Sequence, residues 1–290
     1  MARMHSDQVE ISSTLVRTLI ASQFPGWADL PVSPVDSAGT VNAIFRLGTE
    51  LGVRLPLTPG GVSDVALELR WLPELAPHLP LPVPTPVGAG RPGHGYEWPW
   101  SVYRWLDGTN PAFPLADPTA FATDLAAFLE ALHGIPTAGA PRSGRGVTLA
   151  SRDTAVRRAI GMLTGVIDTA AATRVWEASV RAPEWPGPDC WVHADLSPGN
   201  LLMVDSRLAA VIDFGVMGVG EPAVDLVTAW SLFDSAGREA FRSLTKADDA
   251  TWERGRGWAL SIALLELSYY RETNPAMART AAHVIDQVLA

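Results

Sequence analysis

Four polar residues stand at fixed spacings within one short part of this 290-residue chain. The sequence Trp191-Val192-His193-Ala194-Asp195-Leu196-Ser197-Pro198-Gly199-Asn200 is followed by Val211-Ile212-Asp213-Phe214-Gly215. Transfer of a phosphoryl group to a hydroxyl needs one carboxylate that takes the hydroxyl proton. It also needs an Asn and a second carboxylate that hold Mg²⁺ on the phosphates. A lone His-x-Asp or Asp-Phe-Gly predicts little, but the ordered set His193, Asp195, Asn200 and Asp213 predicts a phosphoryl-transfer site.

The residues between Asn200 and Asp213 predict how these two side chains are presented. Apolar runs at 201–204 and 208–212 flank the turn 205–207, which is the pattern of a short β-hairpin. Asn200 would start this ribbon and Asp213 would end it, so both could share a metal ion. The alternative is that Asp195 and Asp213 are turn residues. For His193 we favour a buried, hydrogen-bonding role that braces the loop.

This ordered set resembles the aminoglycoside phosphotransferase family, the small-molecule branch of the protein-kinase-like fold. In that family the loop reads roughly His-Gly-Asp-Leu-His-Pro-Gly-Asn, and the metal motif reads Ile-Asp-Phe-Gly. The present sequence departs at Ala194 and Ser197, and neither change removes a catalytic functional group. The resemblance implies an α+β, two-lobed fold with a small β-rich N-terminal lobe (1–106) and a larger helical lobe (107–290).

The resemblance also implies roles for individual residues. Asp195 is expected to be catalytic, and Asn200 and Asp213 are expected to bind Mg²⁺. His193 is expected to support the loop. Asp225, in Gly-Glu-Pro-Ala-Val-Asp-Leu, is expected to brace the same loop from the following helix, although it could instead lie on a helix surface.

The first lobe is expected to bind the nucleotide. Strand-like runs at 32–35 and 43–47 flank a turn with Gly39, whose backbone N–H groups could cover phosphates, and a third strand is expected at 51–55. Arg54 occupies the position where kinases carry a phosphate-binding lysine, and its guanidinium can bind phosphate oxygens as a fork. Glu68, on a helical stretch ending at Pro73, is its expected partner. The alternatives are that Glu74 is the partner, or that Glu68 is a solvated helix residue. The hinge backbone near Tyr103 is the expected adenine contact.

The second lobe is predicted to be mainly helical. Residues 137–146 are rich in Gly, Pro, Arg and Ser and predict a mobile loop between helices. The resemblance places the acceptor substrate among the C-terminal helices. The candidate substrate-binding residues, chosen by location alone, are Asp234, Glu266, Tyr269 and Glu272.

Composition narrows the function class. A formal net charge of −9 argues against a nucleic-acid partner and is compatible with a cationic substrate. With 47% hydrophobic and 18% charged residues the chain is an ordinary globular protein. The N-terminal residues lack the apolar core of a signal peptide, and no apolar run reaches the length of a membrane span. We therefore expect a cytoplasmic protein without a membrane partner.

The sequence thus predicts a small-molecule kinase that uses Mg²⁺ and either ATP or GTP. The acceptor would be a hydroxylated small molecule, and the net charge is compatible with a cationic one. The sequence separates neither antibiotic resistance from metabolism nor ATP from GTP. The alternative is a non-catalytic nucleotide-binding protein that kept the kinase-like fold. Loss of Asp195, Asn200 or Asp213 would have favoured that alternative, and all three are present. A metal-dependent hydrolase would need more clustered ligands.

Overall fold

The computed structural model describes residues 11–35 and 41–290, so Gly39 lies outside the described part of the chain. The chain divides into two compact units. Unit 1 comprises Met1–Asp107 together with Ala210–Gly215, and unit 2 comprises Gly108–Ala209 together with Val216–Ala290. Asp213 therefore belongs to unit 1, whereas Asp195 and Asn200 belong to unit 2.

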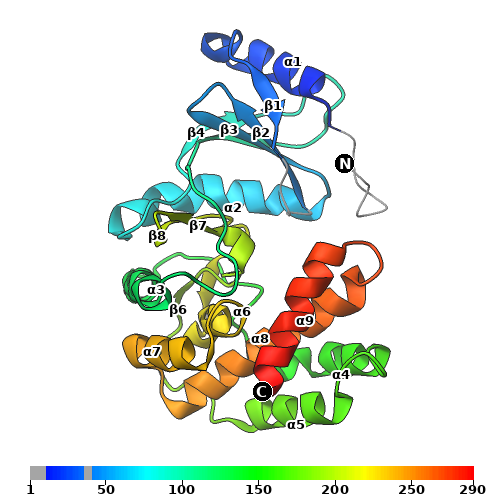
Figure 1. Ribbon diagram of the computed structural model, residues 1–290. Coiled ribbons are helices and arrows are strands. Elements are labelled where there is room, and N and C mark those ends of the chain that lie inside the picture. Colours follow the sequence, from blue (N-terminus) through cyan, green and yellow to red (C-terminus); the bar gives the residue numbers. More distant parts are fainter. Residues whose placement is uncertain (1–10, 36–40) are drawn as a thin grey trace. The chain divides into compact units, whose positions relative to one another are not determined.

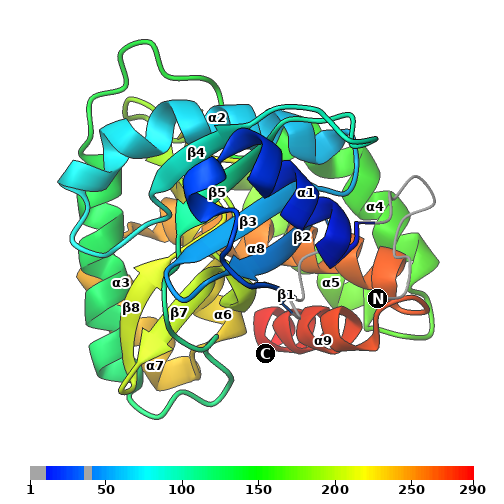
Figure 2. The same ribbon diagram turned by 90° about the horizontal axis from the view of Figure 1, so that it is seen from above.

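Unit 1 is built on a five-stranded antiparallel sheet with the strand order β1-β2-β3-β5-β4. The strands are β1 (Val32–Pro34), β2 (Asn42–Leu47), β3 (Leu51–Pro56), β4 (Pro86–Gly90) and β5 (Trp100–Arg104). The first three strands were expected from the sequence at nearly these positions. One helix, α1 (Ser13–Gln23), packs on one face of the sheet and a second, α2 (Gly60–Leu75), runs along the other (Figure 1). The view from above shows α1 lying across the strands (Figure 2).

Strand β3 is buried along its whole length because helices cover both faces of the sheet. Side chains alternate between the two faces of a strand. Val53 and Leu55 join the apolar core that includes Leu19 and Ile20 of α1. Arg54 lies between them and therefore points to the other face, towards α2. This alternation determines which helix can supply its partner.

Helix α2 continues past Pro73, so the prediction that it ends there is wrong. A proline inside a helix removes one hydrogen bond and crowds the carbonyl four residues earlier. Pro73 lies within the last turn, where little helix remains to be disrupted. The helix ends at Leu75 and a short 3₁₀ helix, η2 (Ala76–His78), follows.

Unit 2 is mainly helical. Its α-helices are α3 (Pro118–His133), α4 (Asp153–Met162), α5 (Thr169–Arg181), α6 (Thr228–Ser231), α7 (Ser235–Thr245), α8 (Asp249–Tyr270) and α9 (Pro275–Leu289). Its 3₁₀ helices are η3 (Leu149–Arg152), η4 (Pro198–Asn200) and η5 (Pro222–Val227). Helix α8 packs against other elements of unit 2, including α9, η5, α5 and α4. Its neighbour η5 is the 3₁₀ helix that contains Asp225.

Two short antiparallel sheets complete the fold. In unit 2, β6 (Cys190–Val192) pairs with β9 (Gly218–Gly220), so β6 leads directly into the 193–200 loop. The other sheet is the hairpin of β7 (Leu201–Val204) and β8 (Arg207–Val211), and the boundary between the units passes through β8. Its turn residues Asp205 and Ser206 have positive φ angles of 48° and 63°, as expected for a two-residue hairpin turn. The predicted hairpin is therefore present.

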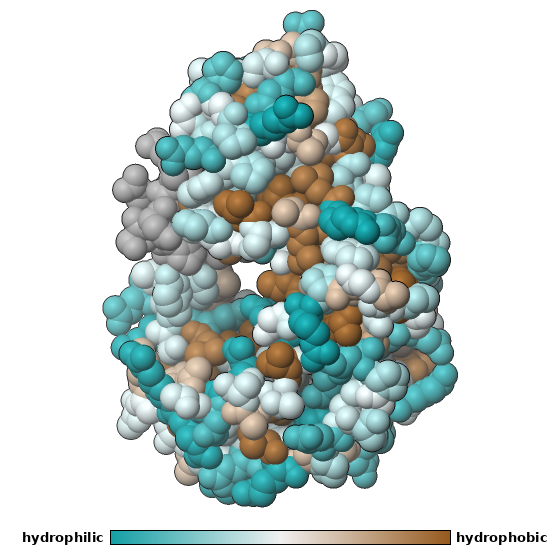
Figure 3. All heavy atoms as spheres, turned by 180° about the vertical axis from the view of Figure 1, so that it is seen from behind, coloured by the Kyte–Doolittle hydropathy of each residue, from teal (hydrophilic) through white to brown (hydrophobic). Residues whose placement is uncertain are grey.

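The surface is mostly hydrophilic on the face drawn in Figure 3, where hydrophobic residues emerge in patches among polar ones. The exposed large hydrophobic residues come from several different elements. They are Phe113, Met162, Val166, Val204, Leu244 and Tyr269. Within the described residues, every helix is too short or too polar to cross a membrane.

Candidate active site

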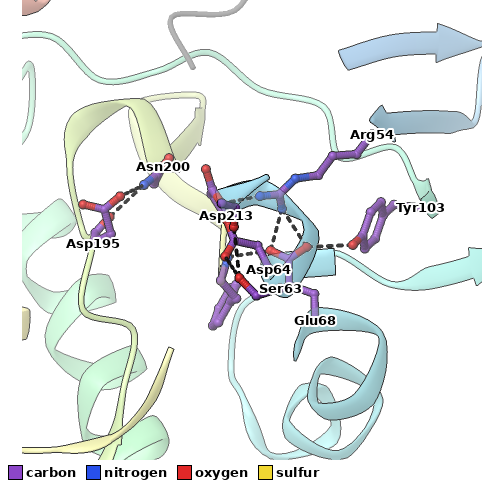
Figure 4. Close-up of polar contacts among 10 residues, drawn as sticks. Arg54, Ser63, Asp64, Glu68, Tyr103, Asp195, Asn200 and Asp213 are labelled. Carbon is purple, nitrogen blue, oxygen red and sulfur yellow. Dashed lines mark hydrogen bonds and ion pairs between the residues drawn. The ribbon is translucent and has the colours of Figure 1, made fainter. Parts of the chain in front are cut away.

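Arg54 is the centre of a buried charged cluster in unit 1. Its Nη1 donates to both Glu68 carboxylate oxygens at 2.6 Å, and its Nη2 donates to Asp213 Oδ1 at 2.8 Å. With the Asn42 side-chain amide turned so that its oxygen faces the guanidinium, that oxygen accepts from Nε at 3.0 Å and from Nη2 at 2.8 Å. Figure 4 shows Arg54 reaching Glu68 and Asp213 at the same time. The structure therefore brings together the predicted residues Arg54, Glu68 and Asp213.

Glu68 connects three segments of unit 1. It is 0% exposed. Besides Arg54, it accepts from the hydroxyl of Tyr103 at 2.6 Å and from the backbone N–H of Phe214 at 2.8 Å. Each carboxylate oxygen thus receives two hydrogen bonds, which is the full acceptor capacity of the group. Glu68 consequently fixes Arg54 and also the backbone next to Asp213.

The electrostatics of the cluster follow from its burial and its charges. Burial alone lowers the pKa of Arg54, but the charges of Glu68 and Asp213 outweigh burial and hold the pKa above its usual value. Burial and the charge of Glu68 raise the pKa of Tyr103 well above 10.0. Both groups therefore keep their protons at neutral pH, Arg54 as a cation and Tyr103 as a neutral donor.

Tyr103 is the second-last residue of β5, which lies between β3 and β4 in the sheet. It faces Gly52 of β3 and Pro86 of β4. The next two backbone N–H groups are also engaged, since Arg104 donates to Thr85 O at 3.0 Å and Trp105 donates to Glu50 O at 2.8 Å. The backbone around Tyr103 thus holds the sheet together, and the Tyr103 side chain belongs to the charged cluster.

Asp64 is a member of the cluster that the sequence analysis missed. It precedes Glu68 by one helical turn on α2, and its carboxyl lies against Gly215, whose Cβ, if present, would come within 2.9 Å of Asp64. Burial raises the pKa of Asp64 to about 6, and the charges of Asp213 and Glu68 act in the same direction against Arg54. The i, i+4 spacing of two acids on one helix was the available signal.

Asp195 and Asn200 face each other across the 193–200 loop of unit 2 (Figure 4). Asn200 Nδ2 donates to the Asp195 backbone O at 2.8 Å and to Asp195 Oδ2 at 3.2 Å. Because the amide nitrogen makes both contacts, the amide oxygen of Asn200 remains available as an acceptor. The Asp195 side chain is 28% exposed, so its carboxylate is accessible.

The loop is held by Asp225, which is fully buried. Asp225 Oδ1 accepts from the Ala194 N–H at 2.7 Å, and Oδ2 accepts from the His193 N–H at 3.1 Å. His133 Nε2 also contacts Oδ2 at 3.0 Å. The His193 ring is buried, and its Nδ1 accepts from the Asp195 N–H at 3.2 Å. These contacts hold Ala194 at φ +67°, a left-handed conformation that is unfavourable for residues other than glycine.

Arg145 is the second residue that the sequence analysis missed. Its Nη1 forms an ion pair with Asp195 Oδ1 and donates to the Ala194 backbone O at 3.2 Å. Fifty positions separate Arg145 from Asp195, and Arg145 stands in a segment without regular periodicity, so no local pattern signalled the contact.

The four predicted substrate-binding residues, all in unit 2, differ in their environments. Asp234 caps α7 and accepts from the Gly237 N–H at 2.8 Å. Tyr269 is exposed, and Glu272 contacts Arg271 at 3.4 Å. Glu266 is different, because burial and the charge of Asp195 raise its pKa to about 7 against the opposing effect of Arg145. Of the four, Glu266 shares the electrostatic environment of Asp195.

Comparisons with known proteins show the family and the fold of this chain. The profile of the phosphotransferase enzyme family matches residues 34–258, and the chain belongs to this family. The GDP and kanamycin complex of APH(2″)-IIIa superposes with a TM-score of 0.76 at 19% identity, covering 94% of this chain and 97% of that chain. The macrolide 2′-phosphotransferase MphH from Brachybacterium faecium gives 0.63 at 22% identity, covering 94% and 97%. The predicted α+β, kinase-like fold is confirmed.

One curated relative is similar over a shorter stretch. The homoserine kinase of Granulibacter bethesdensis (strain ATCC BAA-1260 / CGDNIH1) is 32% identical over 123 residues. This match spans 36% of the present chain and 38% of that protein.

Proposed function

We propose that this protein transfers the γ-phosphoryl group of ATP or GTP to a hydroxyl group of a small molecule. The observation that carries the proposal is the pair of clusters in a phosphotransferase-family chain. One cluster holds Arg54, Glu68 and Asp213, and the other holds Asp195 and Asn200. In this proposal unit 1 is the nucleotide lobe and unit 2 is the acceptor lobe. Solved relatives contain nucleotides: GDP with kanamycin in one case, and ATP with streptomycin in another.

Asn200 and Asp213 are the proposed Mg²⁺ ligands. Mg²⁺ prefers oxygen ligands and is commonly bound through one or two protein groups together with substrate phosphates. The Asn200 amide oxygen is available because its nitrogen makes the contacts to Asp195. Asp213 uses only Oδ1 towards Arg54, so Oδ2 remains for a cation. When bound, the ion would neutralise negative charge on the phosphoryl oxygens.

Arg54 is the proposed phosphate-binding cation. A guanidinium has five N–H donors, and those of Arg54 are directed at Glu68, Asp213 and Asn42. A phosphate oxygen at Nη2 would therefore take the place of Asp213 or Asn42. Release of Asp213 from Arg54 would leave its carboxylate for the metal, so binding of phosphate and metal would assist each other.

Asp195 is the proposed catalytic residue. The acceptor oxygen forms a bond to the γ-phosphorus while the bond from that phosphorus to the bridging oxygen breaks and ADP or GDP leaves. The proton of the acceptor hydroxyl passes to the Asp195 carboxylate. Because the transition state is loose, most of the acceleration should come from positioning and electrostatics.

The acceptor is proposed to be a hydroxylated compound that carries a positive charge. The net charge of −9 and the half-buried Glu266 near Asp195 support this class. Aminoglycosides, macrolides, amino alcohols and the hydroxylated amino acid homoserine define the first compounds to test. Activity with an antibiotic would favour a resistance role, and activity with an amino alcohol alone would favour metabolism.

Nucleotide binding provides the decisive test. Calorimetry with Mg²⁺-ATP and Mg²⁺-GTP should show binding by the wild type, and Asp213→Ala should abolish the Mg²⁺-dependent part. Circular dichroism would establish that the variant is folded. Unchanged affinity in a folded Asp213→Ala protein would refute the metal assignment. Binding without transfer to any acceptor would instead favour the non-catalytic alternative.

A further inference from the structure

The contact between Arg145 and Asp195 lies within unit 2 and involves two partly accessible side chains. Arg145 is 29% exposed and Asp195 is 28% exposed. Ion pairs of this exposure contribute at most about 1 kcal/mol to stability. The small contribution to stability therefore does not explain why a guanidinium lies against the Asp195 carboxylate.

The backbone on both sides of Arg145 is fixed to β9 and the residues next to it. Ser143, which is buried, donates its N–H to Val219 O at 3.1 Å and its hydroxyl to Val216 O at 2.8 Å. The same hydroxyl accepts from the Arg145 N–H at 3.1 Å. After Arg145, Gly146 O accepts from the Glu221 N–H at 2.8 Å.

This attachment gives Arg145 a defined position relative to Asp195. Strand β9 pairs with β6, and β6 leads directly into the 193–200 loop. Gly146 has φ +78°, and a Cβ at this position would lie 3.4 Å from the Glu221 backbone N, so glycine suits the close approach. The segment 137–146, expected to be a mobile loop, is thus fixed at its C-terminal end, which carries Arg145.

Both oxygens of the Asp195 carboxylate are engaged in this arrangement. Oδ1 accepts from Arg145, and Oδ2 accepts from Asn200 Nδ2 at 3.2 Å. A carboxylate has about four lone-pair sites, so acceptor capacity remains for a hydroxyl. The two contacts on opposite oxygens fix the rotation of the carboxylate and thereby the direction of its remaining lone pairs.

We propose that Arg145 is a positioning residue, which holds the Asp195 carboxylate in the orientation needed to receive the proton of the acceptor hydroxyl. This inference rests on the proposed phosphotransferase function. Misplacement of a reacting group by about 1 Å can reduce a rate about 10²-fold. Loss of Arg145 should therefore reduce kcat by about 10- to 100-fold. The Kd for the nucleotide should change much less.

The test compares Arg145→Ala with Arg142→Ala. Arg142 is on the same segment and forms an ion pair with Asp189, but it is 67% exposed and does not contact Asp195. Steady-state phosphorylation of the acceptor should show the fall in kcat for Arg145→Ala and wild-type kcat for Arg142→Ala. Nucleotide Kd, measured by calorimetry, and the Tm should be close to wild type in both.

Two further variants show whether Arg145 acts through Asp195. The double variant Arg145→Ala/Asp195→Asn should be no slower than Asp195→Asn alone, because residues that act as a unit are not additive. Arg145→Lys should recover part of kcat, and added methylguanidinium should partly rescue Arg145→Ala. Full additivity, or kcat for Arg145→Ala within twofold of wild type, would overturn the proposal.

A crystal structure of Arg145→Ala separates this inference from the proposed function. If the wild type transfers no phosphoryl group, the proposed function fails, while the orientation of the Asp195 carboxylate can still be observed. A changed rotamer in the variant supports a positioning role for Arg145. An unchanged rotamer with the Asn200 contact intact overturns it, whatever the activity.

Discussion

The two charged clusters of this protein are constructed differently. In the cluster of unit 1, Arg54 lies on a central strand and Glu68 on a helix, and both side chains are almost fully buried. Asp213, which follows β8, is partly exposed. The cluster of unit 2 sits on irregular segments, and its central carboxylate, Asp195, is partly exposed. The first is enclosed by side chains, and the second is supported mainly through backbone contacts to Asp225 and β9.

This difference predicts that the two clusters respond differently to mutation. A buried charge that loses its partner is left uncompensated, and the cost appears as lost stability. A partly exposed charge can be solvated, so its loss costs little stability and appears as lost activity. Variants of unit 1 should therefore unfold more easily, and variants of Asp195 should remain folded but inactive.

The largest effect is expected for Asp195→Asn. The amide keeps the shape of the side chain but cannot accept the hydroxyl proton. General-base contributions are about 10²- to 10⁴-fold, so kcat should fall by about that factor. Steady-state kinetics with the identified acceptor would measure it, and calorimetry should show nearly unchanged nucleotide Kd.

A matched control for this variant is Asp189→Asn. Asp189 is a similarly exposed carboxylate of unit 2, and its ion-pair partner is Arg142. It should keep wild-type kcat. Wild-type turnover by Asp195→Asn would leave the fold intact but refute the assignment of the catalytic residue.

The next largest effect is expected for Glu68→Gln. The substitution leaves Arg54 buried with only the partly exposed Asp213 as a charged partner, and it replaces one acceptor oxygen with a donor. Removing one member of a buried ion pair costs about 3–5 kcal/mol. Urea denaturation should show a loss of this order, together with weaker nucleotide binding because Arg54 loses its support.

Glu74→Gln is the control on the same helix. Glu74 pairs with Arg70 at the surface, and such i, i+4 pairs contribute about 0.3–0.5 kcal/mol. The two substitutions are chemically identical, so their difference isolates burial. Equal losses of stability would show that the enclosed character of the unit 1 cluster has no energetic consequence.

The same contrast explains what could be predicted from the sequence. Arg54 and Glu68 lie on periodic elements, where alternation in a strand and the turn of a helix indicate which side chains share a face. The hairpin after Asn200 was predictable because its turn and apolar runs are local. The pairing of Arg54 with Glu68 was expected from the family resemblance, and the structure contains this ion pair.

The contacts of Arg145 and Tyr103 could not be predicted from the sequence in the same way. Arg145 lies in an irregular segment, and its contact depends on the hydrogen bonds that join this segment to β9. Tyr103 was expected near the hinge, but the direction of its side chain depends on the register of β5 with β3, which one sequence does not specify. Long-range contacts of this kind depend on tertiary structure.

A smaller effect is expected for Glu266→Gln, which should change how the free energy of unfolding depends on pH. The folded-state pKa of Glu266, about 7, lies above its ordinary 4.5, so between these values the folded state binds more protons than the unfolded state. Stability contributed by this group is then lost as the pH rises from about 4.5 to 7. Because solvent reaches part of the side chain, we expect a loss of about 1–3 kcal/mol.

Urea denaturation at pH 5 and at pH 8 would measure this difference. Asp64, whose pKa is raised to about 6, adds a dependence of the same sign in unit 1. The comparison of wild type with Glu266→Gln isolates Glu266, since Asp64 is present in both proteins. An identical pH dependence in the two proteins would contradict the raised pKa of Glu266 in the folded state.

The smallest effect is expected for Ala194→Gly, which tests the backbone support of the unit 2 loop. Ala194 is buried at φ +67°, and this conformation costs an L-residue about 1–2 kcal/mol. Glycine removes that strain, but the greater entropy of the unfolded chain lowers the free energy of unfolding by about 0.5–1 kcal/mol. The net change should be between zero and about 1.5 kcal/mol of stabilisation. Ala210→Gly, in the regular strand β8, should instead destabilise the protein, because no strain is relieved there. Destabilisation of both variants by the same amount in urea denaturation would show that Asp225 does not hold Ala194 in a strained conformation.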